Sequence, residues 1–382
     1  MATEGFDVRI SLQRLLVGML LVIVPLSILG LYITTHSDKV LQSTVGNHFR
    51  IIAESKAGQI GQFVNDLVVI MGALASSPAV REETAAADTA YRAAGGPAAD
   101  RRIQSIQEHW DGPQSAPAVE MILSTRAAHM LSSYRATDPR FLRVTVTDNS
   151  GAVVAATHKP TKYFYGDDQQ WLAAYAGGKG SIQLGDVKYD SATKTNYISI
   201  AAPVMEEGTG RFLGAAQALV DISPIAAMLN RGLVEGGTHA SLIKDDGTII
   251  FGPDVSMLMN LKAREYPAVS DAITAAGRAT GYVVADIGGG LRNLTAFADT
   301  ELKRDYQNLG WMVIVAQDER EAAAPLRAIG LFALLMLILG LLMTVIFGVY
   351  FHLHRRQRIT DIAPAEEVPE QKEVAATSIH ST

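Results

Sequence analysis

Hydrophobic residues are concentrated in two long uncharged segments near the ends of the chain. Residues 15–33 and residues 328–351 contain no charged side chain. A helix rises about 1.5 Å per residue, so each segment can cross the roughly 30 Å hydrocarbon core of a membrane. We therefore predict transmembrane helices at residues 15–35 and 328–352. A cleaved signal peptide is the alternative for the first, but no small-residue cleavage motif follows it before His36.

Basic residues next to these segments indicate their orientation. They are Arg9, Arg14, Arg355, Arg356 and Arg358. Short cytoplasmic segments are enriched in Lys and Arg, so both termini are expected in the cytoplasm. This gives a cytoplasmic arm at residues 1–14, a disordered cytoplasmic tail at residues 353–382, and an extracytoplasmic domain at residues 36–327. The absence of cysteine suits a bacterial periplasm, and hence a bacterial inner (plasma) membrane, better than a eukaryotic cell surface.

A hydrophobic stripe with alternating spacings of three and four residues follows the first segment. It consists of Leu41, Val45, Phe49, Ile52, Ile60, Phe63, Leu67, Ile70 and Leu74. Only Lys56 interrupts it. This period predicts one long helix over about residues 37–76, roughly 60 Å in length. Either its membrane end projects as a stalk while the rest packs on the domain, or the whole stripe packs against its own domain.

Shorter helical segments follow. The pattern ends at Pro78, after which residues 85–99 are rich in Ala and Gly. Two amphipathic segments, residues 101–110 and 118–135, predict shorter helices. Residues 36–137 are therefore assigned to a stalk and helical part of the domain.

Beyond residue 138 the pattern changes to short β-rich segments in two similar groups. The first comprises residues 142–147, 152–156, 181–183, 197–204 and 212–220, and the second residues 240–244, 248–251, 281–287, 294–297 and 311–316. In each group a turn sequence, at residues 148–151 or 245–247, separates the first two strands. This weak internal duplication predicts an α+β fold in which a long N-terminal helix backs two antiparallel-sheet modules, flanked by two transmembrane helices.

Composition and motifs exclude several classes of function. The 382 residues include 33 Lys and Arg against 39 Asp and Glu, and the formal charge of −6 leaves no basic surplus for nucleic acid. The absence of cysteine excludes disulfides, cysteine zinc sites and iron–sulfur clusters. The histidines lack the spacing of a zinc protease, and no G-x-S-x-G, Walker or strand-linked G-x-G-x-x-G motif is present. We therefore expect no enzyme, no cofactor and no metal site.

Several motifs together resemble the double Cache family of bacterial extracytoplasmic sensors. They are TDNSG at residues 147–151, YFYGDDQQW at 163–171, YISIAAPV at 197–204, LGAAQALVDI at 213–222 and NLGWMVIVAQDEREAAAPL at 308–326. The resemblance implies two PAS-like modules, membrane-distal at residues 138–230 and membrane-proximal at residues 231–327. It also implies that a small solute binds the distal module, and that the transmembrane helices carry the signal to a kinase, cyclase or chemotaxis domain.

The cytoplasmic segments of this sequence are too short and too polar to form such an output domain. We therefore expect a receptor subunit that signals to a separate kinase, cyclase or chemotaxis partner. The alternative is a ligand-free scaffold, or the remnant of a split receptor.

The binding loop departs from the pattern of the family. Members that bind amino acids carry a tyrosine, an arginine and a Trp-Tyr pair in this loop, and an aspartate at the last strand. The corresponding residues here are Phe164, Gln169, Trp171, Leu172 and Asp221. Exchanging a bidentate arginine for glutamine should cost about 1.5–3 kcal/mol, roughly ten- to a hundredfold in affinity for a carboxylate. An α-amino acid is therefore disfavoured as the ligand.

Asp221 instead favours a cationic or amine-bearing solute, with aromatic faces supplied by Trp171 and nearby tyrosines. The candidate ligand-binding residues are Tyr163, Phe164, Tyr165, Gln169, Trp171, Tyr189, Tyr197 and Asp221. Alternatives remain open for these residues. Trp171 suits a core position equally well, Asp221 can cap the helix that begins near residue 223, and Tyr189 and Tyr197 can pack on a sheet.

The second hydrophobic segment carries a pattern of small residues. Gly340, Thr344 and Gly348 are four residues apart, a spacing that lets membrane helices approach closely. They predict a homodimer contact within the lipid bilayer. The alternative is that glycine is simply frequent in membrane helices.

Overall fold

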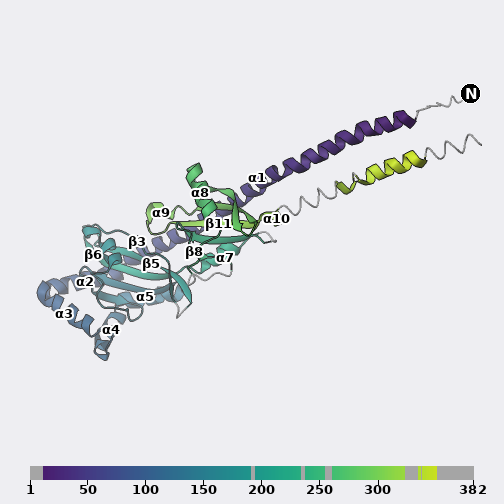
Figure 1. Cartoon of the computed structure of the whole chain (residues 1–382). Coiled ribbons are helices and arrows are strands. Elements are labelled where there is room, and N and C mark those ends of the chain that lie inside the picture. The colour runs from purple at the N-terminus through teal and green to yellow at the C-terminus, as the bar shows by residue number, and fades with distance from the viewer. Residues whose placement is uncertain are drawn as a thin grey trace, which may run out of the picture. The chain divides into compact units, whose positions relative to one another are not determined.

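The computed structural model describes residues 12–190, 194–233, 237–253, 260–322, 334–336 and 338–350 (Figure 1). The chain divides into two units. One is formed by Val40–Ala323, and the other by Met1–Lys39 together with Ala324–Thr382. The first unit contains both β-sheets.

A single long helix, α1, runs from Leu12 to Ala75 and confirms the helix predicted from the hydrophobic stripe. Phe49, Ile60 and Leu67 of the stripe are buried in a core that α1 shares with both sheets. Burial continues to Leu74 near the end of the helix. At the membrane end of the stripe, Val45 and Ile52 are partly buried against the same core, so the stripe packs on the domain from Val45 onward.

The one polar residue in the stripe is also buried. The Lys56 side chain is only 4% exposed, and burial lowers its pKa. Its ammonium donates to the carbonyl oxygens of Met228, at 3.0 Å, and Arg231, at 2.8 Å. Both lie at the C-terminal end of α7 (Pro224–Asn230), so Lys56 supplies donors to carbonyls that the helix leaves unpaired.

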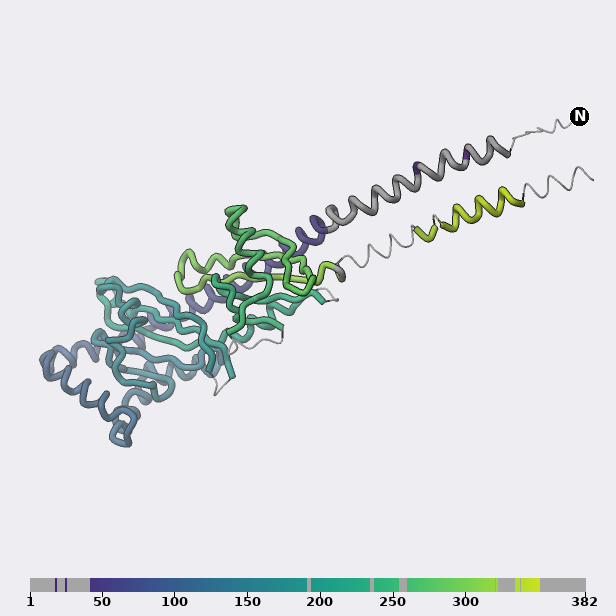
Figure 2. The backbone as a smooth tube through the Cα atoms, in the orientation of Figure 1, coloured from purple at the N-terminus to yellow at the C-terminus, as the bar shows by residue number. Residues whose placement is uncertain are grey.

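A helical segment follows α1 and lies beside the first sheet (Figure 2). It consists of α2 (Pro78–Ala94), α3 (Gly96–Glu108), η1 (Pro113–Ser115), α4 (Ala116–Leu123) and α5 (Arg126–Thr137). Two details differ from prediction. Pro78 begins a helix, because proline fits the first turn, where its missing N–H is not needed. Residues 118–135 form two helices, because the Thr125 hydroxyl accepts from the Ala128 N–H and starts a new one.

The first sheet has six antiparallel strands in the order β2-β1-β6-β5-β3, with β4 also paired to β5. Its strands are β1 (Phe141–Asp148), β2 (Val153–Ala156), β3 (Gln183–Leu184), β4 (Lys188–Asp190), β5 (Thr195–Met205) and β6 (Phe212–Asp221). The first group of predicted strands is present, with β3 overlapping its prediction by one residue. The unpredicted elements are β4, α6 (Gln169–Tyr175) and η2 (Ala176–Gly178).

The second sheet has five antiparallel strands in the order β8-β7-β11-β10-β9. Its strands are β7 (His239–Lys244), β8 (Ile249–Phe251), β9 (Thr280–Gly288), β10 (Leu291–Asp299) and β11 (Trp311–Asp318). The helices of this module are α8 (Tyr266–Ala276), α9 (Leu302–Asp305) and α10 (Glu319–Ala322). In each sheet, the hairpin of the module's first two strands lies next to the strand that comes last in the sequence of the module. The strand that precedes this one in the sequence lies on its other side. The shared strand order confirms the internal duplication.

The two sheets differ in how their second face is covered. One face of each packs on the core that contains α1. On the second sheet, Val269 of α8 packs with Phe297 and Ile314 over the other face. On the first sheet the short helix α6 covers only part of the corresponding face, through Trp171 and Ala174. The rest of that face is not covered by α6.

Both predicted membrane spans are helical where they are described. Residues 15–35 belong to α1, and Leu334–Tyr350 is an apolar helix apart from residue 337, which lies outside the described residues. Among the residues whose side chains the structure describes, which leave out most of residues 12–41, Gln42–Ala75 is long and apolar enough to cross a membrane, but 50% of its most apolar window is buried in the domain. That segment is therefore the core helix of the domain. The predicted tail, residues 353–382, lies outside the described residues.

Candidate functional site

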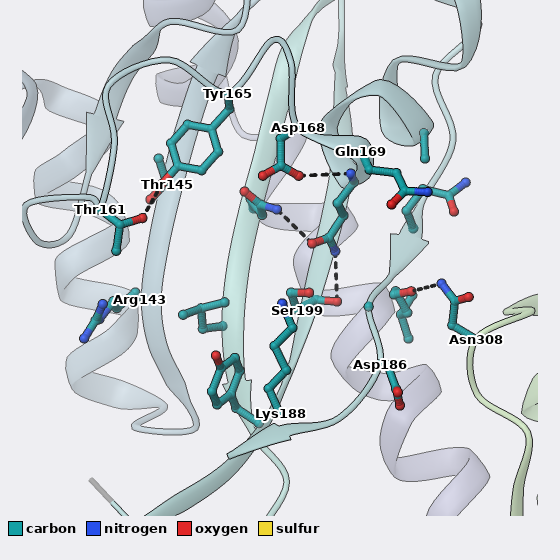
Figure 3. A pocket seen from close by; sticks show the side chains of 18 of the residues that line it. Arg143, Thr145, Thr161, Tyr165, Asp168, Gln169, Asp186, Lys188, Ser199 and Asn308 are labelled. Atoms are coloured by element: carbon teal, nitrogen blue, oxygen red, sulfur yellow. Dashed lines mark hydrogen bonds between the residues drawn. The ribbon is translucent and has the colours of Figure 1, made fainter. Parts of the chain in front are cut away.

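The uncovered face of the first sheet forms a cavity of about 530 Å³. Because side chains alternate along a strand, Ile200 of β5 and Ala218 of β6 face the α1 core, whereas Ser199 and Gln217 face the cavity. The floor is thus formed by β1, β5 and β6. The walls are the β3–β4 segment and the loop that precedes α6 (Figure 3).

One end of this face is closed by an aromatic cluster under α6. The Trp171 ring stacks on Tyr175, with 5.6 Å between centroids, and meets Phe212 edge-on at 5.9 Å. The indole N–H donates to the Thr147 hydroxyl at 2.8 Å inside the core. Trp171 is therefore a core residue, and it does not belong to the cavity lining.

A chain of hydrogen bonds fixes the amide groups of the cavity. The Gln217 amide donates to the Gln170 side-chain oxygen at 2.9 Å, and the Gln170 amide donates to the Ser199 carbonyl at 3.2 Å (Figure 3). The Gln170 backbone N–H in turn donates to the Asp168 carboxylate at 3.0 Å, which caps α6. Hydrogen bonds within the protein therefore fix the orientation of these amide groups.

Both acidic and basic side chains line the cavity, but only the acidic ones are paired with side chains of opposite charge. The Asp168 carboxylate lies 3.4 Å from the Lys162 ammonium, and the Asp186 carboxylate lies 2.6 Å from the Lys244 ammonium. Arg143 and Lys188 also line the cavity. Neither forms an ion pair within the described part of the chain.

The wall between β3 and β4 is fastened to the second module. Asp186 in this wall pairs with Lys244 at the end of β7. The Asn308 amide, which follows α9, donates to the Leu184 carbonyl at 3.0 Å and itself lines the cavity (Figure 3). Both modules therefore contribute to the same wall.

The loop that carries Tyr165 is held to the β1–β2 hairpin. The Tyr165 backbone N–H donates to the Gly151 carbonyl at 2.8 Å. Gly151 has a φ of +95°, and a Cβ placed there would lie 2.3 Å from the Gly166 nitrogen. Only glycine accommodates this backbone and this close approach.

Three of the residues proposed from the sequence line the cavity: Tyr165, Gln169 and Tyr197. The others lie outside the lining, at Tyr163, Phe164, Trp171, Tyr189 and Asp221. Tyr163 is buried against Trp110, with 5.4 Å between the rings, and burial raises its pKa. The Asp221 carboxylate accepts from the Ser223 N–H at 2.7 Å in the turn ahead of α7. Ser223 is the N-cap of α7, so Asp221 holds this turn and does not cap the helix as the alternative predicted. The argument for a cationic solute rested on Asp221, so that expectation has no support from the cavity.

The lining residues that the sequence reasoning missed include Arg143, Gln170, Lys188, Ser199, Gln217 and Asn308. One signal was available for Gln217, which is the only polar residue between Phe212 and Val220 of a strand that otherwise reads as apolar. A polar side chain in such a strand marks a face that is not core. The position of Lys188 depends on β4, which is too short to be recognised by its pattern.

A second titratable cluster lies in the other module. His239, at the start of β7, is 3.8 Å from the Glu265 carboxylate, which also accepts from the Asn293 amide at 2.8 Å. Glu265 raises the pKa of His239, against the lowering effect of burial. Burial acts to raise the pKa of Glu265, but contacts with His239, the backbone and Asn293 together lower it. The cluster ties the start of α8 to β7 and β10, and no group of residues suited to a metal ion occurs in the described ranges.

Comparisons with known proteins agree with this architecture. A model of the Cache domain matches residues 37–326. The sensory domain of the Campylobacter jejuni chemoreceptor Tlp3 (CcmL) shares the fold at a TM-score of 0.50 and 11% identity, over 75% of this chain and 99% of that chain.

Two solved ligand-binding domains of Pseudomonas chemoreceptors are also similar. That of PctB from Pseudomonas aeruginosa PAO1, in complex with L-Arg, has a TM-score of 0.44 and 16% identity over 74% of this chain and 92% of that chain. The ligand-binding domain of CtaA from Pseudomonas fluorescens, in complex with L-serine, has a TM-score of 0.45 and 15% identity. The match covers 72% of this chain and 98% of that chain.

These similar proteins are sensor or ligand-binding domains of receptors, not enzymes. No curated protein sequence matched the chain. The family model covers most of the chain, including α1 from residue 37 and both sheets, and thereby confirms the resemblance to the double Cache family. The chain belongs to the Cache domain family.

Proposed function

We propose that this protein is a membrane-anchored extracytoplasmic sensor of a small solute, which binds in the cavity on the open face of the first sheet. The observation that carries the proposal is the cavity itself. It has about 530 Å³ of space, within the usual range for small-molecule sites, and its amide groups are already held in position. In a Cache domain, such a hollow is the natural place for the ligand.

We propose further that residues 15–35 and 328–352 anchor the domain in a bacterial plasma membrane, with both termini in the cytoplasm. The helical conformation of residues 15–35 and of the described part of residues 328–352, together with the basic flanks of both segments, supports this topology. Binding then shifts a two-state equilibrium of the domain, and the membrane helices pass the change to a separate kinase, cyclase or chemotaxis partner.

A homodimer through the second membrane helix belongs to the same proposal. The Thr344 hydroxyl donates to the Gly340 carbonyl at 2.8 Å, so it is satisfied inside its own helix and leaves the face free for close packing. Replacing Gly340 and Gly348 by leucine should weaken self-association of this span in a membrane two-hybrid assay. Val345→Leu, which is off this face, is the control, and equal association of all three proteins would contradict the proposal.

A thermal-shift screen of the full chain in lipid nanodiscs tests the ligand function. A solute at a hundred times its dissociation constant should stabilise the protein by about 2.7 kcal/mol. The panel contains organic anions, amines, amino acids, sugars and nucleobases.

A variant that fills the cavity serves as the specificity test. Thr145→Trp, on the cavity floor, should abolish the shift, whereas Thr137→Trp, exposed at the end of α5, should retain it. If no solute shifts the melting temperature, or if Thr145→Trp leaves the shift intact, the cavity is not the ligand site. The ligand-free scaffold is the better explanation in the first case, whereas in the second case the solute binds elsewhere on the protein.

A further inference from the structure

We propose that the solute is a small hydrophilic organic anion, with its carboxylate against the Lys188 ammonium. This inference rests on the proposed function, because it takes the cavity on the first sheet as the ligand site. It is carried by the distribution of charge around that cavity and by the direction of one side chain.

The two carboxylates that line the cavity already accept hydrogen bonds from backbone N–H groups and lie next to lysine side chains. Asp168 accepts from the Gln170 N–H at 3.0 Å and lies 3.4 Å from the Lys162 ammonium. Asp186 accepts from the Val187 N–H at 2.7 Å and from Lys244 at 2.6 Å. A cationic solute would have to displace these donors, and would gain little by the exchange.

The cations of the lining have no such partners. Lys188 and Arg143 line the cavity and form no ion pair with any described residue. Lys162 is shared by Asp168 and Asp167, the latter at 3.2 Å, whereas Asp186 has Lys244. Counted together with these partners, the charged lining residues still carry one positive charge more than negative. An anion gains from that charge without breaking a bond in the protein.

The position of Lys188 makes it the principal contact. Its side chain rises from β4 into the cavity, toward Ser199 on the floor (Figure 3). Arg143 lies on the far strand, β1, at the other side of the floor. An acid lying across the floor thus meets an ammonium at one side and a guanidinium nearer the other.

The remaining lining indicates the body of the solute. Its side chains include the neutral amides Gln170 and Gln217 and the hydroxyl groups of Thr145, Tyr165 and Tyr197. Groups of this kind exchange hydrogen bonds with hydroxyl or carbonyl groups and offer little to a long alkyl chain. A hydroxy acid or a sugar acid fits this lining better than a fatty acid.

Binding to the full chain in lipid nanodiscs tests the inference, by thermal shift and by titration calorimetry. The anionic probes are lactate, malate and gluconate. The matched probes are glycerol and glucose without charge, putrescine as a cation, and L-alanine and L-serine as zwitterions. We expect at least one acid to bind, and its affinity to fall as salt rises, because Lys188 is accessible to solvent.

Three variants assign the effect to one side chain. Lys188→Gln should weaken binding of the acid about tenfold, the effect of losing one charged hydrogen bond. Lys188→Arg, which keeps the charge, should retain binding within a few-fold. Lys179→Gln removes the same charge from an exposed residue outside the cavity and should change nothing.

Each outcome decides between the two proposals. If an acid binds but Lys188→Gln binds it as well as the unmodified protein does, the inference is wrong. If putrescine, glucose or an amino acid binds in the cavity and no acid does, the inference is wrong but the sensor function stands. If no probe of any class binds, both are overturned.

Discussion

The role of Trp171 can be decided by comparison with a second buried tryptophan. Trp171 is buried, and its indole N–H donates to the Thr147 hydroxyl at 2.8 Å. Trp311, at the start of β11, is also buried, but its indole N–H has no hydrogen-bond partner among the described residues. Exchanging either for phenylalanine removes a similar volume. Only the exchange at Trp171 removes a hydrogen bond.

The magnitudes follow from this difference. Losing the hydrogen bond in Trp171→Phe should cost about 1 kcal/mol in unfolding free energy, in addition to the cost of lost packing. Trp311→Phe also loses packing, but it removes a buried N–H donor that has no partner. Removing this donor should recover about 1 kcal/mol or more of unfolding free energy. Trp171→Phe should therefore be the less stable variant by about 2 kcal/mol. In a domain of this size that difference lowers the melting temperature by about 3–4 °C.

Thermal melts of the full chain in nanodiscs, with and without a bound solute, distinguish a core residue from a ligand contact. As a core residue, Trp171→Phe lowers the melting temperature of the free protein and leaves the ligand-induced shift unchanged. Equal melting temperatures for the Trp171 and Trp311 variants would refute the hydrogen-bond argument. If Trp171→Phe abolished the ligand-induced shift but left the melting temperature of the free protein unchanged, Trp171 would contact the ligand instead.

Two further predictions concern a turn and an ion pair. Gly151→Ala should lower the free energy of unfolding by about 2 kcal/mol or more, because the new Cβ clashes with the Gly166 backbone and alanine disfavours the positive φ. Gly208→Ala, where φ is +84° but the Cβ would lie in open space, should cost only about 1 kcal/mol. Similar melting temperatures for the two variants would contradict this. The pair of His239, whose pKa is raised, and Glu265, whose pKa is lowered, should stabilise the fold most between about pH 4.5 and 6.5. Its contribution is lost as the pH rises through the folded pKa of His239 or falls through that of Glu265. Melts from pH 3 to 8 should show this dependence, and His239→Gln should flatten it; an unchanged profile would exclude the pair as its origin.

Long and strongly patterned elements were predictable from the sequence, and short ones were not. The stripe that defines α1 and the alternation of β1 with its Asp148–Gly151 turn were sufficient for those elements. The helix α6 has seven residues, too few to display a helical period, and β4 has three. Pro78 was ambiguous, because the same residue can end one helix or begin the next.

The cavity was predictable only in part, for a related reason. Tyr165, Gln169 and Tyr197 were found because their surroundings resemble a known family. Whether an aromatic residue such as Trp171 faces a solute or the core depends on which part of the sheet α6 covers. That is a property of tertiary packing, and composition does not reveal it. Lys188 reaches the cavity because of the register between β4 and β5, which pairs it with Tyr197.

The double attachment of the β3–β4 wall limits how the cavity can respond to occupancy. Lys188 extends from one end of this segment, while Asp186 and the Leu184 carbonyl are bonded to Lys244 and Asn308 of the neighbouring module. A solute that pulls β4 inward must therefore either stretch these two bonds or drag the neighbouring sheet along with it. Under the proposed function, a displacement of Lys188 would therefore be passed through this segment to the second module.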